Sequence, residues 1–185
     1  MIDAVPDAIA TLVAHHDRVR AHLDRLDVLA RGPEDPARRD EWLEAIAALA
    51  RSALDLVNDE GRMHGLDEER SLFPRLREAL TTADAELADA LARAETDHED
   101  LPPFWAPLEQ WLGSLVVPDA VVSLPALRDA HRAVVERYLP HLRLEEIVIF
   151  PAAERLLGAP TLTLIAQEIR DRRLRPPPIG TRVAP

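Results

Sequence analysis

The sequence contains no cysteine and few aromatic residues, and both shortages narrow the range of folds and of chemistry. Without thiolates the chain forms no disulfide and no cysteine-ligated iron–sulfur cluster, so any metal must be held by nitrogen and oxygen. Aromatic residues make up only 4% of the chain, whereas the helix formers alanine, leucine, arginine and glutamate are abundant. We therefore expect an all-α fold.

Positive charge is also in short supply. The chain has 22 lysines and arginines against 33 aspartates and glutamates, which gives a formal net charge of -11. Nucleic acids and anionic membranes need a basic protein surface, so we expect neither as a partner. No stretch approaches the roughly 20 apolar residues that span a bilayer, and the N-terminus has no export signal. These absences predict a cytoplasmic protein.

Apolar residues recur at helical spacing in four long segments and one short segment. The long segments begin near Pro6, near Asp40, at Thr81 or Thr82, and near Leu124. Asp40 and either threonine can act as N-caps. We predict an up-and-down four-helix bundle in residues 1–160, a short docking helix in 161–175 and a disordered proline-rich tail in 176–185.

Glycines and prolines interrupt these predicted helices. Gly61 and Gly65 lower the helix propensity of the second segment and predict a kink there. Pro74 is expected to disrupt the backbone hydrogen-bond ladder of that segment. Pro102 and Pro103 predict a kink or a restart within the third segment.

One motif occurs twice in the chain: a His, two Glu at i+4 and i+5, and then Phe-Pro. The two copies are His64-Gly-Leu-Asp-Glu-Glu-Arg-Ser-Leu-Phe-Pro74 and His141-Leu-Arg-Leu-Glu-Glu-Ile-Val-Ile-Phe-Pro151. Four residues of helix turn the chain by about 400°, so the i+4 Glu lies within roughly 40° of the His and about 6 Å along the axis. Apolar neighbours on the same stripe direct both side chains into the interior.

Each copy is preceded by a histidine that lies on an apolar helix face and is followed by an acid. His16 precedes His64 by 48 residues, and His98 precedes His141 by 43. Each half of the chain is thus a helix pair, and the two pairs direct four imidazoles and two carboxylates into one core. We predict the metal ligands to be His16, His64, Glu68, His98, His141 and Glu145.

This set of donors suits two metal ions. Two six-coordinate ions have about twelve positions, of which four His, two bridging Glu and a shared oxygen fill about ten. Dioxygen, peroxide or nitric oxide can bind at the remaining positions, whereas a purely structural site is closed. Imidazole together with carboxylate suits iron, manganese or zinc and disfavours calcium and magnesium.

The same residues resemble the hemerythrin-like, or HHE cation-binding, domain family over about residues 8–157. The resemblance is carried by His16, His98 and the doubled His-x-x-x-Glu-Glu motif. It implies an up-and-down four-helix bundle that houses a non-haem, carboxylate-bridged di-iron centre, with the same six ligands, which binds or senses oxygen.

The sequence departs from the oxygen-carrying hemerythrins at two positions. Pro102 stands where those proteins have a further histidine one turn after the third-helix ligand, and Glu146 stands where they have an aspartate. With one nitrogen ligand fewer, a sensor, an iron- or peroxide-handling protein or a nitric-oxide binder fits at least as well as a reversible oxygen carrier.

Residues beside the predicted ligands are expected to have ordinary roles. Glu69 and Glu146 lie about 140° from the ligand face of a regular helix and are expected in solvent, unless a π-bulge turns them inward. His15 is the main rival to His16 as a ligand. Surface positions, or positions next to the ligands, are expected for His15, His22 and His131.

Our leading hypothesis is a binding or sensing protein with two iron ions, or zinc or manganese in their place, whose ligand is dioxygen, peroxide or nitric oxide. One alternative is a di-iron enzyme with ferroxidase, peroxidase or catalase-like activity. Another is a structural helical module held together by metal. Turnover of peroxide or ferrous ion distinguishes the enzyme, and a redox-silent zinc content indicates the structural module.

Overall fold

The structure, a computed structural model, describes residues 7–33, 35–117 and 123–175, and its regular elements in these ranges are all helical. Consecutive helices that follow one another along one line form a helical column, and the first column is α1 (Ala8–Leu29). After the short 3-10 turn η1 (Pro36–Arg38), the second column is continuous through α2 (Arg39–Asp55), the π-helical η2 (Leu56–Gly61), α3 (Arg62–Asp67), the π-helical η3 (Glu68–Leu72) and α4 (Phe73–Ala79). The all-α prediction is confirmed for the described residues.

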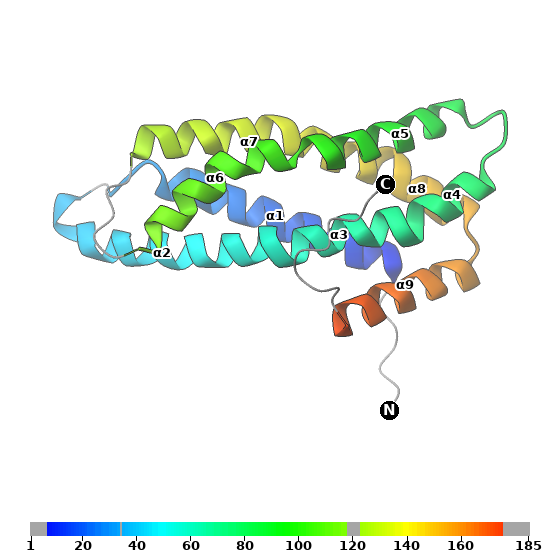
Figure 1. Cartoon of the computed structure of the whole chain (residues 1–185), viewed down its shortest axis with the longest axis horizontal. Coiled ribbons are helices and arrows are strands. Elements are labelled where there is room, and N and C mark those ends of the chain that lie inside the picture. Colours follow the sequence, from blue (N-terminus) through cyan, green and yellow to red (C-terminus); the bar gives the residue numbers. More distant parts are fainter. Residues whose placement is uncertain (1–6, 34, 118–122, 176–185) are drawn as a thin grey trace.

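The second half of the chain repeats this layout. The third column consists of α5 (Ala85–Asp100) and α6 (Pro102–Leu115), and the fourth of α7 (Leu124–Leu144), the π-helical η4 (Glu145–Ile149) and α8 (Phe150–Leu156). The columns lie alongside one another, and α9 (Ala159–Leu174) packs on their outside against α1, α3 and η3 (Figure 1). The predicted helix at 161–175 is thus present and begins slightly earlier. The predicted tail, 176–185, lies outside the described residues.

The second helix starts near Asp40 as predicted, since α2 begins at Arg39, but two predicted N-caps are wrong. Asp40 is not an N-cap: the side chain of Asp35 accepts a hydrogen bond from the backbone N–H of Ala37 and opens η1, from which α2 continues. Thr81 does not open a helix either. Its N–H and its hydroxyl both donate to the carboxylate of Asp84, so it belongs to the turn that precedes α5.

The helices become irregular near the prolines and glycines for which an interruption was predicted. The third column stops at Asp100 and restarts at Pro102, as predicted, because a proline at the start of a helix lacks only an N–H that has no intrahelical partner. The second column does not break at Gly61 or Pro74; it widens into the π-helical segment η2, which ends at Gly61, and into η3, which ends at Leu72, two residues before Pro74.

The apolar core is divided along the bundle into two clusters. One contains Leu12 and Ala94 and lies where α1, α4, α5, α8 and α9 meet, and the other contains Val19 and Leu101 and lies among α1, α2, α6 and α7. His16 falls between the two clusters on α1, as does His98 on α5. A layer of buried polar side chains therefore crosses the molecule between two apolar layers.

Among the described helices, none has the length and the apolar character that crossing a bilayer requires.

Candidate metal centre

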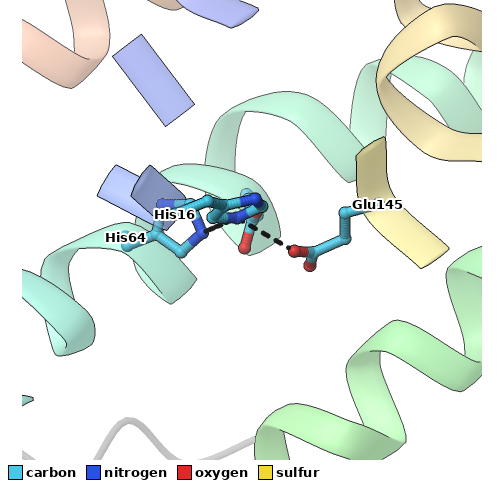
Figure 2. A group of neighbouring side chains, drawn as sticks. His16, His64 and Glu145 are labelled. Carbon is cyan, nitrogen blue, oxygen red and sulfur yellow. Dashed lines mark hydrogen bonds and ion pairs between the residues drawn. The ribbon is translucent and has the colours of Figure 1, made fainter. Parts of the chain in front are cut away.

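The six residues predicted as ligands meet in the polar layer. His16 comes from α1, His64 from α3, His98 from α5 and His141 from α7, while Glu68 and Glu145 are the first residues of η3 and η4. Their side chains are at most 2% exposed, except that of His98 at 11%. Figure 2 shows His16 between His64 and Glu145.

The ring nitrogens that face one another are all Nε2 atoms. The Nε2 of His16 lies 2.9 Å from that of His64 and 3.2 Å from Oε2 of Glu145. The Nε2 of His64 lies 3.2 Å from Oε1 of Glu68, and that of His141 lies 3.2 Å from Oε1 of Glu145. Four separate helical columns therefore present their donor atoms to one small volume.

Each buried carboxylate faces histidines from both halves of the repeat. Glu68 directs Oε1 to His64 and Oε2 to His98, which lies 3.3 Å away. Glu145 directs Oε2 to His16 and Oε1 to His141, with His98 at 3.6 Å from Oε1. Two groups able to hold a cation result, one of His16, His64, Glu68 and Glu145 and one of His98, His141 and Glu145. Glu145 belongs to both groups, and Glu68 belongs to the first.

The hydrogen bonding of these carboxylates fits a metal site. All four oxygens of Glu68 and Glu145 lie at ion-pair distance from imidazoles, yet none makes a hydrogen bond of good geometry within the described residues. A buried carboxylate without donors costs several kcal/mol, on the order of 3–5, whereas a cation satisfies it. Two ligand atoms that bind one metal ion at about 2.1 Å and at right angles are about 3.0 Å apart. The donor atoms of this cluster lie at similar distances from one another.

The pKa shifts of the cluster also fit a metal site. Burial raises the pKa of Glu68, but the nearby imidazoles of His64 and His98 outweigh it and hold this pKa well below its usual value. Burial lowers the pKa of His98, but the nearby carboxylates of Glu145, Glu68 and Glu69 outweigh it and raise this pKa well above its usual value. The pKa of His16 is raised in the same way by Glu145. The two buried carboxylates thus favour positive charge beside them, and a metal cation can supply it.

The expectation that Glu69 and Glu146 lie in solvent is wrong for Glu146, whose side chain is 26% exposed, and right only in part for Glu69, which is 42% exposed but bonded to a predicted ligand. Oε1 of Glu146 lies 2.8 Å from Nδ1 of His16, and Oε1 of Glu69 lies 2.9 Å from Nδ1 of His98. Arg20 donates to both oxygens of Glu146, at 2.7 and 2.8 Å. Each glutamate at i+5 thus holds the histidine of the other half of the chain. The signal in the sequence was the second Glu of the motif, which both copies keep.

The remaining two ligand histidines have different neighbours. Nδ1 of His141 lies 3.5 Å from Oδ2 of Asp97, the residue before His98. The equivalent residue in the first half is His15, whose ring stacks on that of His64 at 4.3 Å. His15 is 1% exposed, and burial lowers its pKa to about 2, so it is a neutral imidazole. His15 was expected either at the surface or next to the ligands, and it lies next to the ligands.

The other two histidines lie away from the cluster. His131 is buried and bonds to the carbonyl oxygen of Leu23, so the surface position expected for it is wrong. His22 is half-buried and bonds to Oγ of Ser52 and to the carbonyl oxygen of Arg18.

A cavity of about 330 Å³ adjoins the cluster. His64, His98 and His141 line it together with His15, Tyr138 and apolar side chains of α1, η2, α3 and α6. The Tyr138 ring lies 5.7 Å from that of His141 and 5.4 Å from that of Trp105, and burial raises the pKa of Tyr138. Molecules that enter this cavity reach the imidazole side of the centre.

Comparison with known proteins agrees with this geometry. A family model described as the hemerythrin HHE cation binding domain matches residues 7–153, which include all six converging side chains. No curated protein matches the chain.

Proposed function

Because this chain belongs to the hemerythrin HHE cation-binding domain family, we propose that it holds two iron ions in a four-helix bundle and binds or senses dioxygen or a related small ligand. The proposed ligands are His16, His64, Glu68, His98, His141 and Glu145. The observation that carries the proposal is the pair of buried glutamates that face histidines of both halves and find no hydrogen-bond donor of good geometry in the part of the chain that the structure describes.

The donor set favours a pair of ions over one. Glu145 belongs to both groups of converging donors, and Glu68 directs one oxygen toward each half of the repeat. Two carboxylates that bridge neighbouring cations are satisfied on both oxygens at once, which a single cation does not achieve for both. Nitrogen and oxygen donors together suit iron, with manganese or zinc as the other metals that accept them.

The surrounding residues orient the ligands. Glu146 and Glu69 accept the Nδ1–H of His16 and His98, which fixes the tautomer of each ring and directs its other nitrogen inward. Phe150 stacks on the ring of His16 and Phe73 on that of His98, so both rings are also held by packing. The Phe of each motif copy therefore supports the histidine of the opposite half.

Iron ions held here would supply a redox-active site for dioxygen, peroxide or nitric oxide. The cavity next to His64, His98 and His141 offers such molecules a path, and its apolar walls keep bulk water away from the imidazoles. Since Pro102 stands where a further histidine ligand occurs in oxygen carriers, we propose sensing or ligand binding rather than oxygen transport.

Elemental analysis of the purified protein, with an optical spectrum under air and after reduction, tests this proposal. We expect about two irons per chain and a near-ultraviolet charge-transfer band that is lost on reduction. The double variant Glu68→Ala, Glu145→Ala should lose most of the iron, whereas a control with the exposed Glu86→Ala and Glu154→Ala should keep it. A stable wild-type protein without metal would refute the proposal, and a zinc-only protein would support the structural alternative.

The same double variant separates a binding protein from an enzyme. A di-iron enzyme should consume hydrogen peroxide or ferrous ion much faster than the double variant does. Equal rates, together with full iron content in the wild type, would leave binding or sensing as the function.

A further inference from the structure

The geometry points to a second binding site: the cavity beside the metal cluster binds a small, neutral, phenol-like molecule whose polar group hydrogen-bonds to His15. The inference goes beyond the proposed function, on which it rests only for the identity of the neighbouring cluster. The walls of the cavity are made by protein side chains, so a molecule can bind there without a metal ion.

The cavity is much larger than a diatomic ligand needs. Its volume of about 330 Å³ is at the lower end of the range for small-molecule sites, about 300–1,000 Å³, and about twice that of a cavity that holds benzene, about 150 Å³. Its lining extends along the third column from His98 to Glu109, about three turns of helix. An organic molecule of one ring with a substituent fits these dimensions.

The cavity lies beside the cluster rather than within it. Three of the imidazoles line it, namely those of His64, His98 and His141, but His16 and the two facing carboxylates do not. Its occupant would therefore lie next to the cluster without displacing the glutamates.

The deep walls are apolar and aromatic. Val19, Leu56 and Leu101 are buried and line the cavity, and the rings of Trp105 and Tyr138 meet there edge to face. Aromatic rings pack favourably against such surfaces, and burial of apolar area supplies most of the affinity at sites of this kind. An aromatic molecule is thus the best match for the walls.

His15 supplies the polar contact. It is 1% exposed and lines the cavity, and neither of its ring nitrogens has a hydrogen-bond partner among the described residues. The nearest acid, Glu60, lies 3.9 Å away, beyond hydrogen-bonding distance. A buried imidazole without partners is costly, and one hydroxyl group of a ligand supplies a partner for one of its two nitrogens. In the second half, the equivalent Asp97 already faces His141, so only the first half offers this contact.

Charged side chains of the lining argue for a neutral ligand. The charged residues of the lining are two acids, Glu69 and Glu109, and one base, Arg62; both acids are at least partly exposed, and Glu69 is already bonded to His98. The acids outnumber the base, and this excess of negative charge disfavours a carboxylate ligand relative to a neutral one. A phenol carries the hydrogen-bonding group without the charge.

Binding of phenol, toluene and benzoate to the full chain tests this inference. Titration calorimetry gives the affinity, and tryptophan fluorescence reports the position because Trp105 lines the cavity. We expect one phenol and one toluene per chain, with and without chelator treatment, and benzoate at least about tenfold weaker than phenol.

Two pairs of variants locate the site. Val19→Phe fills the cavity and should weaken phenol and toluene by about tenfold or more, whereas Val28→Phe, at a 63% exposed position of the same helix, should change neither. His15→Phe keeps a ring against His64 but removes both nitrogens, so it should weaken phenol about fivefold to tenfold and leave toluene within about twofold. His22→Phe, also on α1 but outside the lining of the cavity, is its matched control.

Equal phenol affinity in the wild type and in Val19→Phe, or in the wild type and in His15→Phe, would overturn the inference, as would equal binding of benzoate. Circular dichroism shows whether each variant folds, and Leu56→Phe fills the same cavity should Val19→Phe fail to fold. Iron analysis of the same samples separates the two proposals: phenol binding without metal supports the cavity alone, and metal without phenol binding supports the centre alone.

Discussion

At the scale of single residues, the second glutamate of each motif copy has the least expected role. Glu146 and Glu69 lie behind the rings of His16 and His98 and accept their Nδ1 protons. Burial raises the pKa of Glu146, but hydrogen bonds from Arg20 and His16 outweigh it and keep the group anionic. An anionic acceptor makes the opposite ring nitrogen a better metal donor and holds the ring in place.

We therefore predict that Glu146→Gln lowers metal affinity without unfolding the protein. Loss of such a carboxylate behind a ligand histidine typically costs about 10- to 100-fold in affinity. Competition with a chelator of known affinity measures the change. Glu154→Gln, an exposed position on the following helix α8, serves as the control, and equal affinities for the two variants would contradict the role assigned to Glu146.

At the scale of helical elements, the π-helical segments explain how adjacent glutamates reach the same interior. η3 begins at Glu68 and η4 at Glu145, so the irregular turn occurs at the same place in both copies of the motif. The i→i+5 hydrogen bonding of a π turn adds one residue to the turn, so each residue is rotated less from the one before it than in an α-helix. Glu69 and Glu146 therefore point closer to the direction of Glu68 and Glu145, which precede them. Both Glu69 and Glu146 reach the ligand histidines in this way, although Glu69 stays partly exposed to solvent.

The C-terminal helix α9 is attached beside this irregular turn. Arg172 pairs with Asp67, which is fully buried, and donates to Oγ of Ser71 at 2.8 Å, while Arg173 lies 3.1 Å from Asp67. Burial raises the pKa of Asp67 although both arginines oppose it, so its charge depends on them. These arginines thus have an internal partner next to Glu68.

Removal of one arginine should weaken this attachment. We predict that Arg172→Met destabilises the protein by about 2–4 kcal/mol, somewhat less than the usual loss for a broken buried pair because Arg173 remains. Urea unfolding followed by circular dichroism measures the change. Arg170→Met on the same helix should cost less than about 1 kcal/mol, and equal effects of the two substitutions would show that Asp67 does not depend on Arg172.

At the scale of the whole molecule, the polar layer lies between two apolar clusters that each draw on several columns. The clusters can maintain the helices on either side, so removal of metal should loosen the middle of the molecule without abolishing the fold. A bound cation contributes to stability through its affinity for the folded state alone.

We predict that iron raises the free energy of unfolding by about 4 kcal/mol at a free concentration of a thousand times its Kd. The stabilisation should decline as the pH falls, because protons compete with metal for His16 and His98, whose raised pKa values favour the protonated rings at low pH. Thermal unfolding with iron and with chelator, at several pH values, measures both effects.

The variant Glu68→Ala, Glu145→Ala is the control for this experiment. Its melting temperature should respond little to chelator at any pH, since it lacks the two carboxylates that face both halves. A wild-type protein that melts at the same temperature in iron and in chelator would show that the layer needs no cation.

The sequence by itself determined the helical class and which six side chains converge. This was possible because a His and a Glu four residues apart share one helix face whatever the surroundings, and because the motif occurs twice. His16 and His98 followed from their place on apolar faces, which the core must bury.

Only the tertiary structure decided what surrounds those ligands. The roles of Glu69 and Glu146 depend on a π turn that regular helical geometry does not predict, and each acts on a residue from the other half of the chain. The cavity beside His15 depends on how α1, η2, α3, α6 and α7 pack around it. Such contacts join residues far apart in sequence, so no local spacing specifies them.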